Sequence, residues 1–276
     1  MQLRCGAQLL DLSCPAVMGV LNVTPDSFSD GGRFNTADLA VEHGIRLAAE
    51  GAAIIDVGGE STRPGAAPVN VDEELRRVIP VIERLRAATS VVISIDTQKP
   101  EVMRAAADAG AGLINDVRAL LNPGALEAVA STSCAVCLMH MQGEPGTMQL
   151  HPTYSDVVSD IKVFLAERVQ ACRSVGISDE RIVLDPGFGF GKTAAHNLEL
   201  LRRLSDVTTD GLPILAGLSR KSMIAKLLGD PARDRLPASV ALAVIATMHG
   251  ARIVRVHDVA ATVDAMKMVA AVIERG

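Results

Sequence analysis

Short apolar runs alternate along this chain with segments in which apolar residues recur every three or four positions. The runs VMGVLN, AAIIDV and VVISID are typical of strands buried on both faces, as in a parallel sheet covered by helices. Between the second and third runs, helical spacing is shown by Leu75, Val78, Ile79, Ile82 and Leu85. The alternation continues along the chain and gives eight strand–helix units.

Eight such units predict an α/β protein with a (β/α)8 TIM barrel rather than an open doubly wound sheet, because eight parallel strands close into a barrel. No linker or low-complexity segment interrupts the pattern, so we expect a single domain over residues 1–276. Residues 1–14 precede the first unit and predict a short N-terminal β-hairpin with its turn at Gly6. The expected packing residues of the hairpin are Leu3, Leu9, Leu10 and Leu12.

Polar side chains stand where the predicted strands end. They are Asn22, Asp56, Asp96, Asn115, His140, Asp185, Arg255 and His257. The carboxyl ends of barrel strands meet at one mouth, which is where such barrels carry their active sites. A single residue in such a place is about as often a satisfied buried group as a functional one. The whole set, however, predicts a functional site.

The segment after Asn22 is longer than most strand–helix connections and carries Asp26, Ser27 and Asp30. Pro25 prevents the strand from continuing, so we expect a functional loop here.

Local signals also predict two element boundaries. The helix that follows this loop is expected to be capped by Asn35 or Thr36 and to be ended by Gly51. The strand AAIIDV is expected to end at Asp56.

Composition narrows the function. The net charge of -5 and the aromatic content of 2% give no basic or base-stacking surface, so we expect no nucleic-acid partner. No apolar run approaches the length that spans a membrane and no signal peptide is evident, so we expect a cytoplasmic protein without a membrane partner. The five cysteines favour reduced thiols, and the spacing of Cys134 and Cys137 predicts opposite strand faces rather than a shared metal.

The glycine-rich segment GFGFGKT resembles two phosphate-binding motifs and matches neither. Pro186 stands where the P-loop requires its first glycine, and Lys192 stands where the dinucleotide motif requires its third. Binding of ATP or NAD is therefore disfavoured. Phe188 and Phe190, beside Asp185, instead suggest a place for a flat ligand.

The polar residues divide into two chemical groups. Arg63, Arg255 and His257 suit an anion such as phosphate, and Asn22 offers a neutral oxygen for a lightly held Mg2+.

The second group suits a nitrogen heterocycle. Asp96 and Asp185 are acceptors for adjacent N–H groups, Asn115 is both donor and acceptor, and Lys221 is a donor. Phe28 and Phe190 are expected to form apolar walls. No Ser-His-Asp or Cys-His nucleophile is evident.

Eight motifs in order carry a resemblance to a known family. They are MGVLNVTPDSFSDGG, DVGGESTRPGA, SIDT, NDV, LMHMQG, DPGFGFGKT, GLSRKSM and VRVHDV, between residues 18 and 259. Together they closely resemble the dihydropteroate synthases of bacterial folate synthesis. The resemblance implies a barrel, typically a homodimer, that condenses 6-hydroxymethyl-7,8-dihydropterin diphosphate with p-aminobenzoate to give 7,8-dihydropteroate and diphosphate.

The resemblance also implies roles for individual residues. The dihydropterin diphosphate would be bound by Thr62, Asp96, Asn115, Met139, Asp185, Lys221, Arg255 and His257. The p-aminobenzoate would be bound by Phe28, Thr62, Arg63, Pro64, Phe190, Lys221 and Ser222. The catalytic group would be Asn22, Arg63, Asp96, Lys221, Arg255 and His257, with Asn22 on the Mg2+.

The implied mechanism is Mg2+-assisted departure of diphosphate followed by attack of the neutral arylamine, which needs no strong base. In similar proteins, sulfonamides compete for the p-aminobenzoate position. The less familiar segments are ALLNPG after NDVR and LPASV at residues 236–240, the second of which is close to helices used in dimerisation.

Two alternatives remain open. A pterin-binding methyltransferase barrel would share the pterin pocket, but the STRPG and RVH motifs would then have no purpose. A non-catalytic pterin-binding paralogue would be expected to have a broken site, whereas every matched position here is intact.

Overall fold

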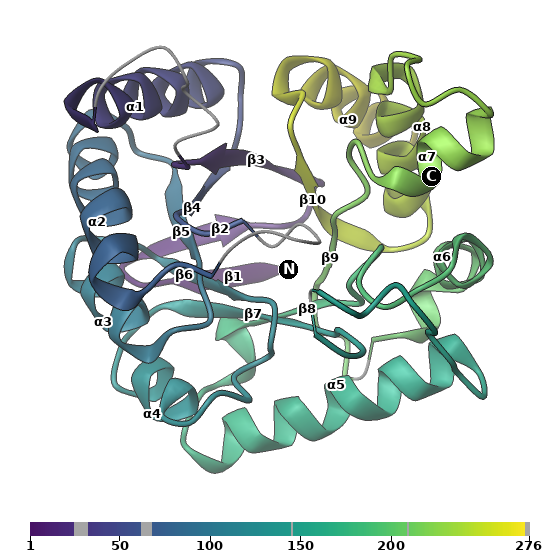
Figure 1. The fold of residues 1–276 in the computed structure, drawn as a ribbon, viewed down its shortest axis with the longest axis horizontal. Helices are drawn as coiled ribbons and strands as arrows, with labels where there is room; N and C mark the ends of the chain where they lie inside the picture. Colours follow the sequence, from purple (N-terminus) through teal and green to yellow (C-terminus); the bar gives the residue numbers. More distant parts are fainter. Residues whose placement is uncertain (25–32, 62–67, 145, 209, 274–276) are drawn as a thin grey trace.

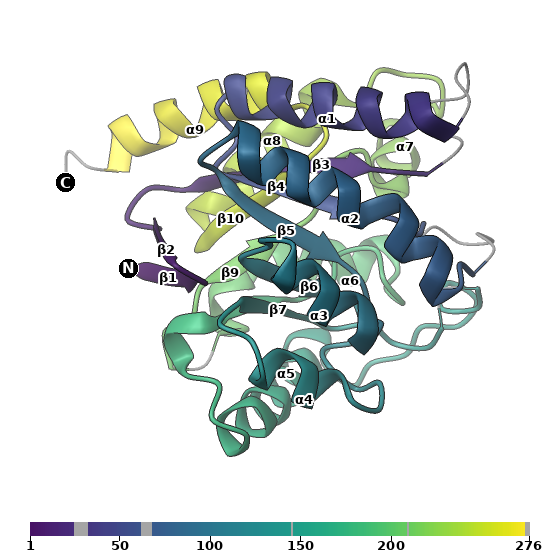
Figure 2. The same ribbon diagram turned by 90° about the vertical axis from the view of Figure 1, so that its left-hand side faces the viewer.

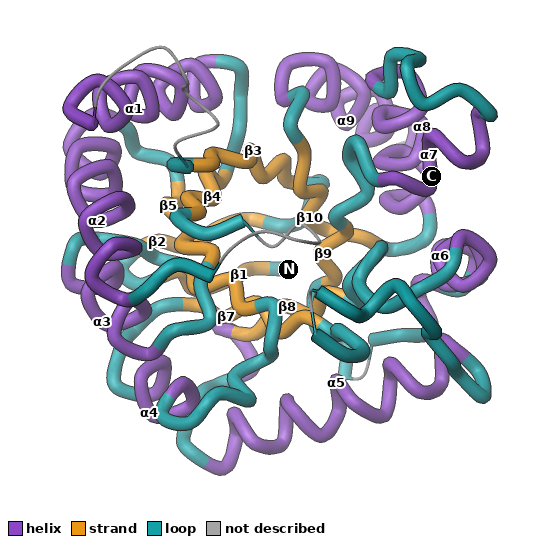
Figure 3. Tube along the Cα trace, viewed as in Figure 1, coloured by secondary structure: helices purple, strands orange, loops and turns teal. Residues whose placement is uncertain are grey.

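The computed structural model of the chain describes residues 1–24, 33–61, 68–144, 146–208 and 210–273. Eight parallel strands close into a barrel in the order β10-β3-β4-β5-β6-β7-β8-β9, and helices surround it (Figures 1 and 3). The strands are β3 (Ala16–Asn22), β4 (Ile54–Gly58), β5 (Val92–Asp96), β6 (Leu113–Asp116), β7 (Ala135–Met139), β8 (Ile182–Asp185), β9 (Ile214–Ala216) and β10 (Ala251–Val256). The predicted TIM barrel is confirmed.

Helices follow the strands in sequence and form the outer layer. They are α1 (Arg33–Ala49), α2 (Val71–Ala88), α3 (Pro100–Asp108), α4 (Ala125–Ala130), α5 (Val157–Ser174), α6 (Ala194–Arg202), α7 (Ser222–Leu228), α8 (Leu236–Met248) and α9 (Val259–Ile273). Two short 3-10 helices, η2 (Asp179–Arg181) and η3 (Leu204–Asp206), lie beside them. No helix among these described residues is long and apolar enough to cross a membrane.

The predicted N-terminal hairpin is confirmed as β1 (Gln2–Cys5) paired with β2 (Gln8–Asp11). Figure 2 shows it at the end of the barrel where the strands begin. Leu3 and Leu12 are fully buried there, in one cluster with the barrel-interior residues Met18 and Ile54. The hairpin thus closes the end of the barrel opposite the mouth.

The prediction that Leu9 packs in the core is wrong, because its side chain is 55% exposed. Side chains alternate along a strand, and Leu9 is paired with the exposed Arg4, whereas Leu10 is paired with the buried Leu3.

Two predicted boundaries are also wrong. Helix α1 begins at Arg33, so Asn35 and Thr36 lie inside the helix instead of capping it. Strand β4 extends to Gly58, because its neighbours β3 and β5 continue the backbone ladder on both sides of it. Asp56 therefore lies within the strand, below the barrel mouth, rather than at the strand end.

The two faces of β7 are lined by different cores. Cys134, just before the strand, belongs to the layer between strands and helices, whereas Cys137 belongs to the barrel interior. The predicted separation of the two thiols is confirmed. Across the described ranges no group of three His, Cys, Asp or Glu residues is arranged to hold a metal.

Candidate active site

A half-buried arginine at the barrel mouth joins two carboxylates. Arg255 on β10 donates from Nε to Asp56 Oδ2 at 2.6 Å and from Nη2 to Asp96 Oδ2 at 2.9 Å. The fully buried Asp56 also accepts from Ser94 Oγ at 2.6 Å and from Asn115 Nδ2 at 3.1 Å. Both oxygens of this carboxylate are thus satisfied by side chains from three other strands.

Strand register explains why these side chains meet. Asp56 on β4 is level with Ser94 on β5, and Asp96 on β5 is level with Asn115 on β6. Asp96 follows Ser94 by two residues, so both side chains point to the same face of β5. The site is therefore built in two layers, a lower one at Asp56 and an upper one at Asp96.

An amide oxygen in the upper layer has no partner. Asn115 is 4% exposed, and its Oδ1 atom is buried without a hydrogen bond to any part of the chain that the structure describes. Buried carbonyl oxygens are nearly always paired in folded proteins. An acceptor left open beside Asp96 is therefore suited to a ligand N–H donor.

Asp185, at the end of β8, supplies a further hydrogen-bond acceptor at the barrel mouth. It ends β8 level with Met139 on β7, and its Oδ1 accepts from the backbone N–H of Gly187 at 2.7 Å. Lys221, the residue before α7, holds its Nζ 4.2 Å from the centre of the Phe190 ring. Acceptors, a cation and an aromatic face thus lie at the same end of the barrel.

Burial shifts the protonation equilibria of these groups. It raises the pKa of Asp96 to about 7, with Arg255 opposing the shift and Asp56 adding to it, because one guanidinium faces two carboxylates. Burial also raises the pKa of Asp185, although the hydrogen bond from the Gly187 N–H and the charge of Lys221 oppose the shift. Burial, followed by the charge of Arg255, lowers the pKa of Lys221 to about 8. The mouth therefore holds groups that titrate near neutral pH.

The remaining described candidates lie around this cluster. Gly58 separates Asn22 from Asp96, since a Cβ added to it would lie 3.6 Å from Asn22 Oδ1 and 3.6 Å from Asp96 Cβ. His257 follows β10, and its Nδ1 lies 3.1 Å from Ser219 Oγ. Asn22 and His257 are half-buried, and Ser222, the first residue of α7, is exposed.

Four predicted ligand contacts, Phe28, Thr62, Arg63 and Pro64, lie outside the described residues. Phe188 is described, and the expectation that it helps to hold a flat ligand is wrong. Its side chain is 1% exposed and belongs to the apolar layer between strands and helices. Of the two phenylalanines in the glycine-rich segment, Phe190 is the one that is half-buried beside Lys221.

Sequence reasoning did not single out the residues that support the site from beneath. Ser94 holds Asp56, Ser219 contacts His257, and Lys192 lies under the glycine-rich segment. Ser94 could have been found from its position two residues before Asp96, because residues two apart on a strand share a face. No sequence signal marked Lys192 as buried.

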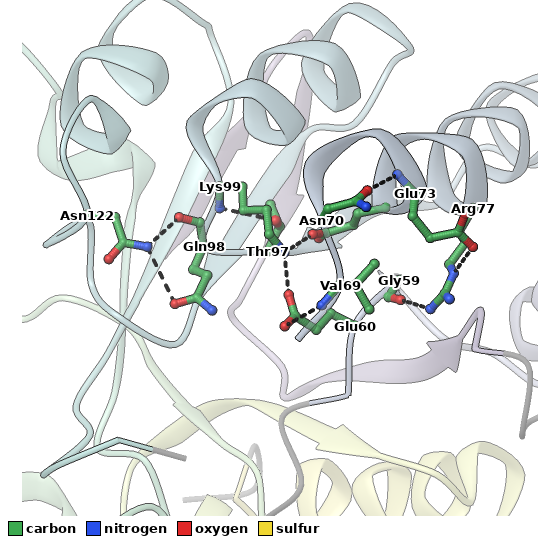
Figure 4. Close-up of polar contacts among 11 residues, drawn as sticks. Gly59, Glu60, Val69, Asn70, Glu73, Arg77, Thr97, Gln98, Lys99 and Asn122 are labelled. Carbon is green, nitrogen blue, oxygen red and sulfur yellow. Dashed lines mark hydrogen bonds and ion pairs between the residues drawn. The ribbon is translucent and has the colours of Figure 1, made fainter. Parts of the chain in front are cut away.

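Outside the mouth, a second charged cluster joins the described ends of the β4–α2 connection (Figure 4). Lys99 contacts both Glu60 after β4 and the fully buried Glu74 on α2. Glu60 Oε1 accepts from the Val69 backbone N–H at 3.2 Å, and Arg77 donates to the Gly59 carbonyl at 2.8 Å. The residues on either side of positions 62–67 are thereby fixed to each other and to α2.

Carboxylates and an unpaired amide acceptor lie above a closed parallel barrel, and comparison with known proteins shows that this barrel is of the pterin-binding class. The family model described as "Pterin binding enzyme" matches residues 18–257. Dihydropteroate synthase of Escherichia coli is 55% identical over 271 residues, covering 98% of this chain and 96% of that protein. The Haemophilus influenzae enzyme is 51% identical, covering 97% of this chain and 98% of the relative.

Solved structures extend the similarity to three dimensions. The Yersinia pestis dihydropteroate synthase in a sulfonamide drug complex has a TM-score of 0.94 and 53% identity, covering 99% of this chain and 100% of that one. The Burkholderia cenocepacia enzyme complexed with 7,8-dihydropteroate has a TM-score of 0.90 and 50% identity, with 99% and 97% covered. The chain belongs to the dihydropteroate synthase family and is a transferase, as its motifs predicted.

The Lys99 cluster generates a stability prediction. Lys99→Met would leave the buried Glu74 carboxylate without its cation, and we expect the free energy of unfolding to fall by on the order of 3 kcal/mol in urea denaturation. Arg76→Met, which removes an exposed ion pair from the same helix, is the matched control and should cost below about 1 kcal/mol. Equal effects of the two substitutions would contradict this account of the cluster.

Proposed function

We propose that this chain condenses 6-hydroxymethyl-7,8-dihydropterin diphosphate with p-aminobenzoate, forming 7,8-dihydropteroate and diphosphate. The observation that carries the proposal is the open Asn115 Oδ1 acceptor between Asp96 and Asp185, on a chain whose relatives are dihydropteroate synthases. A reduced pterin ring presents adjacent N–H donors of the kind these acceptors require. The chain as a whole would act as one pterin-binding domain.

The pterin would be held by residues from four strand ends and one helix start. Asp96, Asn115 and Asp185 would accept from the ring, Lys221 would donate to it, and Met139 would line the pocket. The neighbouring N–H of Gly187 and the guanidinium of Arg255 keep two of these carboxylates oriented. Ring binding thus rests on side chains that other buried groups already hold in place.

Arg255, His257, Thr62 and Arg63 would hold the diphosphate. Mg2+ fits this half of the site, because Asn22 offers a neutral oxygen near Asp96 while the diphosphate and water would supply the remaining oxygen ligands. When bound, Mg2+ would add positive charge next to the departing diphosphate.

The p-aminobenzoate would lie beside Phe190, Lys221 and Ser222, with Phe28, Thr62, Arg63 and Pro64 completing its contacts. A relative from Xanthomonas albilineans, 55% identical over 98% of this chain with a TM-score of 0.92, was solved with 4-aminobenzoic acid. Sulfonamides, which mimic that acid, would compete at the same place, in line with the Yersinia pestis complex.

The reaction would break the C–O bond between the pterin methylene and the diphosphate and form a C–N bond to the arylamine. Arg255, His257, Arg63 and Lys221 would stabilise the charge of the leaving diphosphate, while the pterin ring delocalises the positive charge of its methylene. The neutral amine attacks and then loses a proton to water. No side chain is required as a strong base.

A homodimer in the cytoplasm is the proposed state. The exposed apolar residues Ile245 and Met248 on α8, and Met268 and Val272 on α9, lie on adjacent helices. Their exposed fractions, from 41% to 70%, are high for apolar side chains of this size, and a second copy would cover them.

Met248→Glu or Met268→Glu should convert the dimer to a monomer, because a carboxylate would be buried in the apolar contact. Sedimentation should then report a mass near the chain mass of 28.9 kDa instead of twice that value. Val163→Glu changes an equally exposed residue on α5 and should leave the mass unchanged. A wild-type monomer at micromolar concentration would refute the proposed dimer.

The activity is tested by following diphosphate and dihydropteroate formation with Mg2+, with and without p-aminobenzoate. Arg255→Ala should lower kcat/KM by about 100-fold or more, because a cation on the leaving group is lost. Arg252→Ala removes an arginine from the same strand and should have little effect. Arg255→Lys, which retains a cation beside Asp56, separates lost chemistry from lost folding. Pterin binding without product from the wild type would favour the methyltransferase or the non-catalytic alternative.

Pterin affinity should also depend on pH. Asp96 must be ionised to accept from the ring, and with its pKa raised to about 7 it becomes protonated as pH falls below that value. The dissociation constant of a dihydropterin should therefore increase by up to about tenfold per pH unit between pH 7 and 5.5. Calorimetry on Asp96→Asn should show weaker binding with a flatter pH dependence. Identical slopes in the two proteins would argue against this role of Asp96.

A further inference from the structure

Lys192 is a buried lysine for which the reaction has no assigned use, and burial lowers its pKa to about 7 against the opposing charge of Asp185. It lies in the glycine-rich segment between β8 and α6, and its side chain is 3% exposed. Its Nζ donates to the carbonyls of Gly187 at 2.8 Å and Phe190 at 3.0 Å, and lies 3.0 Å from His140 Nδ1. The His140 carbonyl is at 3.5 Å. These partners are uncharged and belong to two loops at the barrel mouth.

His140 is suited to accept from this ammonium. Burial, together with the charge of Lys192, lowers the pKa of His140 to about 3, so its imidazole stays neutral. A neutral ring that accepts at Nδ1 carries its proton on Nε2. Lys192 therefore links the end of β7 to the segment after β8 through His140 Nδ1 and the carbonyls of Gly187 and Phe190.

The two loops approach so closely that glycine is required at their contacts. A Cβ on Gly187 would lie 1.9 Å from the His140 carbonyl oxygen, and one on Gly191 would lie 2.3 Å from the Gln142 carbonyl oxygen. Both glycines also have positive φ, at 69° and 61°. The segment can curl around the Lys192 ammonium only because these positions have no side chain.

The backbone position of Phe190 depends on the hydrogen bonds of Lys192 more than the position of Gly187 does. Gly187 is held independently by its N–H bond to Asp185 and by its packing on His140. The Phe190 carbonyl accepts a hydrogen bond from Lys192 Nζ. The Phe190 N–H donates to the Gly187 carbonyl, which also accepts from Lys192 Nζ. Both backbone hydrogen bonds of Phe190 itself thus lead to Lys192, while its neighbours Gly189 and Gly191 are bonded to Asn197 and Tyr154.

We propose that Lys192 is a positioning residue for p-aminobenzoate binding: its ammonium gathers the carbonyls of Gly187 and Phe190 and thereby sets the Phe190 ring against Lys221. This inference rests on the proposed function, in which Phe190 and Lys221 frame p-aminobenzoate. The pterin contacts Asp96 and Asn115 lie on β5 and β6 and are held by other groups. Asp185 keeps its bond from the Gly187 N–H without Lys192, so loss of the ammonium is expected to weaken p-aminobenzoate binding more than pterin binding.

Lys192→Met tests the proposal, since it keeps the aliphatic chain and removes the charge. We expect the KM for p-aminobenzoate and the inhibition constant of a sulfonamide to rise at least fivefold, while kcat and the KM for the pterin diphosphate change by less than twofold. Lys192→Gln, whose amide can still donate to two carbonyls, should give values between those of wild type and Lys192→Met. Lys162→Met makes the same chemical change at an exposed position on α5 and should match wild type.

Circular dichroism and the thermal midpoint establish that each variant is folded, and if Lys192→Met does not fold, Lys192→Gln carries the same comparison. A p-aminobenzoate KM within twofold of wild type would overturn the proposal. So would a parallel change of kcat and both KM values, because that indicates a general structural role. If the wild type itself forms no dihydropteroate, the proposed function fails instead, and the two failures are distinguishable.

Discussion

The arrangement of this site depends on one constraint, which is that Arg255 must neutralise two carboxylates inside the barrel. Asp56 is fully buried, and an isolated charge there would be strongly unfavourable. Ser94, Asn115 and Arg255 satisfy it, and a second nitrogen of Arg255 reaches Asp96. Four strands are thereby joined around a single ion-pair network.

This network also prepares the surface above it. Asn115 donates its amide hydrogen to Asp56, and its oxygen is buried without a partner within the described part of the chain. The second carboxylate, Asp96, has its pKa raised to about 7 because burial is only partly offset by the shared guanidinium. The resulting row of acceptors is poorly satisfied without a ligand, and a donor-rich heterocycle is complementary to it.

On the other side of the mouth, a buried basic side chain instead of a buried carboxylate is held by polar partners. Lys192 is satisfied by carbonyl dipoles and a neutral imidazole, and it shapes the segment that carries Phe190. Lys221 then lies over that ring as the cation available at the surface of the site. A carboxylate network thus lies under the proposed pterin half of the site, and Lys192 lies under the proposed p-aminobenzoate half.

The sequence alone predicted the barrel, because it contains eight repeats of an apolar run and an amphipathic segment, and eight is the number of parallel strands that closes. It also placed Asp96, Asn115 and Asp185 at strand ends, since a continuous apolar run that stops at a polar residue is a local signal. Only the tertiary structure decided that β4 runs on to Gly58, which carries Asp56 below the mouth, and that Phe188 turns into the core. The pairing of Arg255 with Asp56 and the burial of Lys192 were likewise invisible in the sequence, because strand register and loop contact bring together residues far apart along the chain.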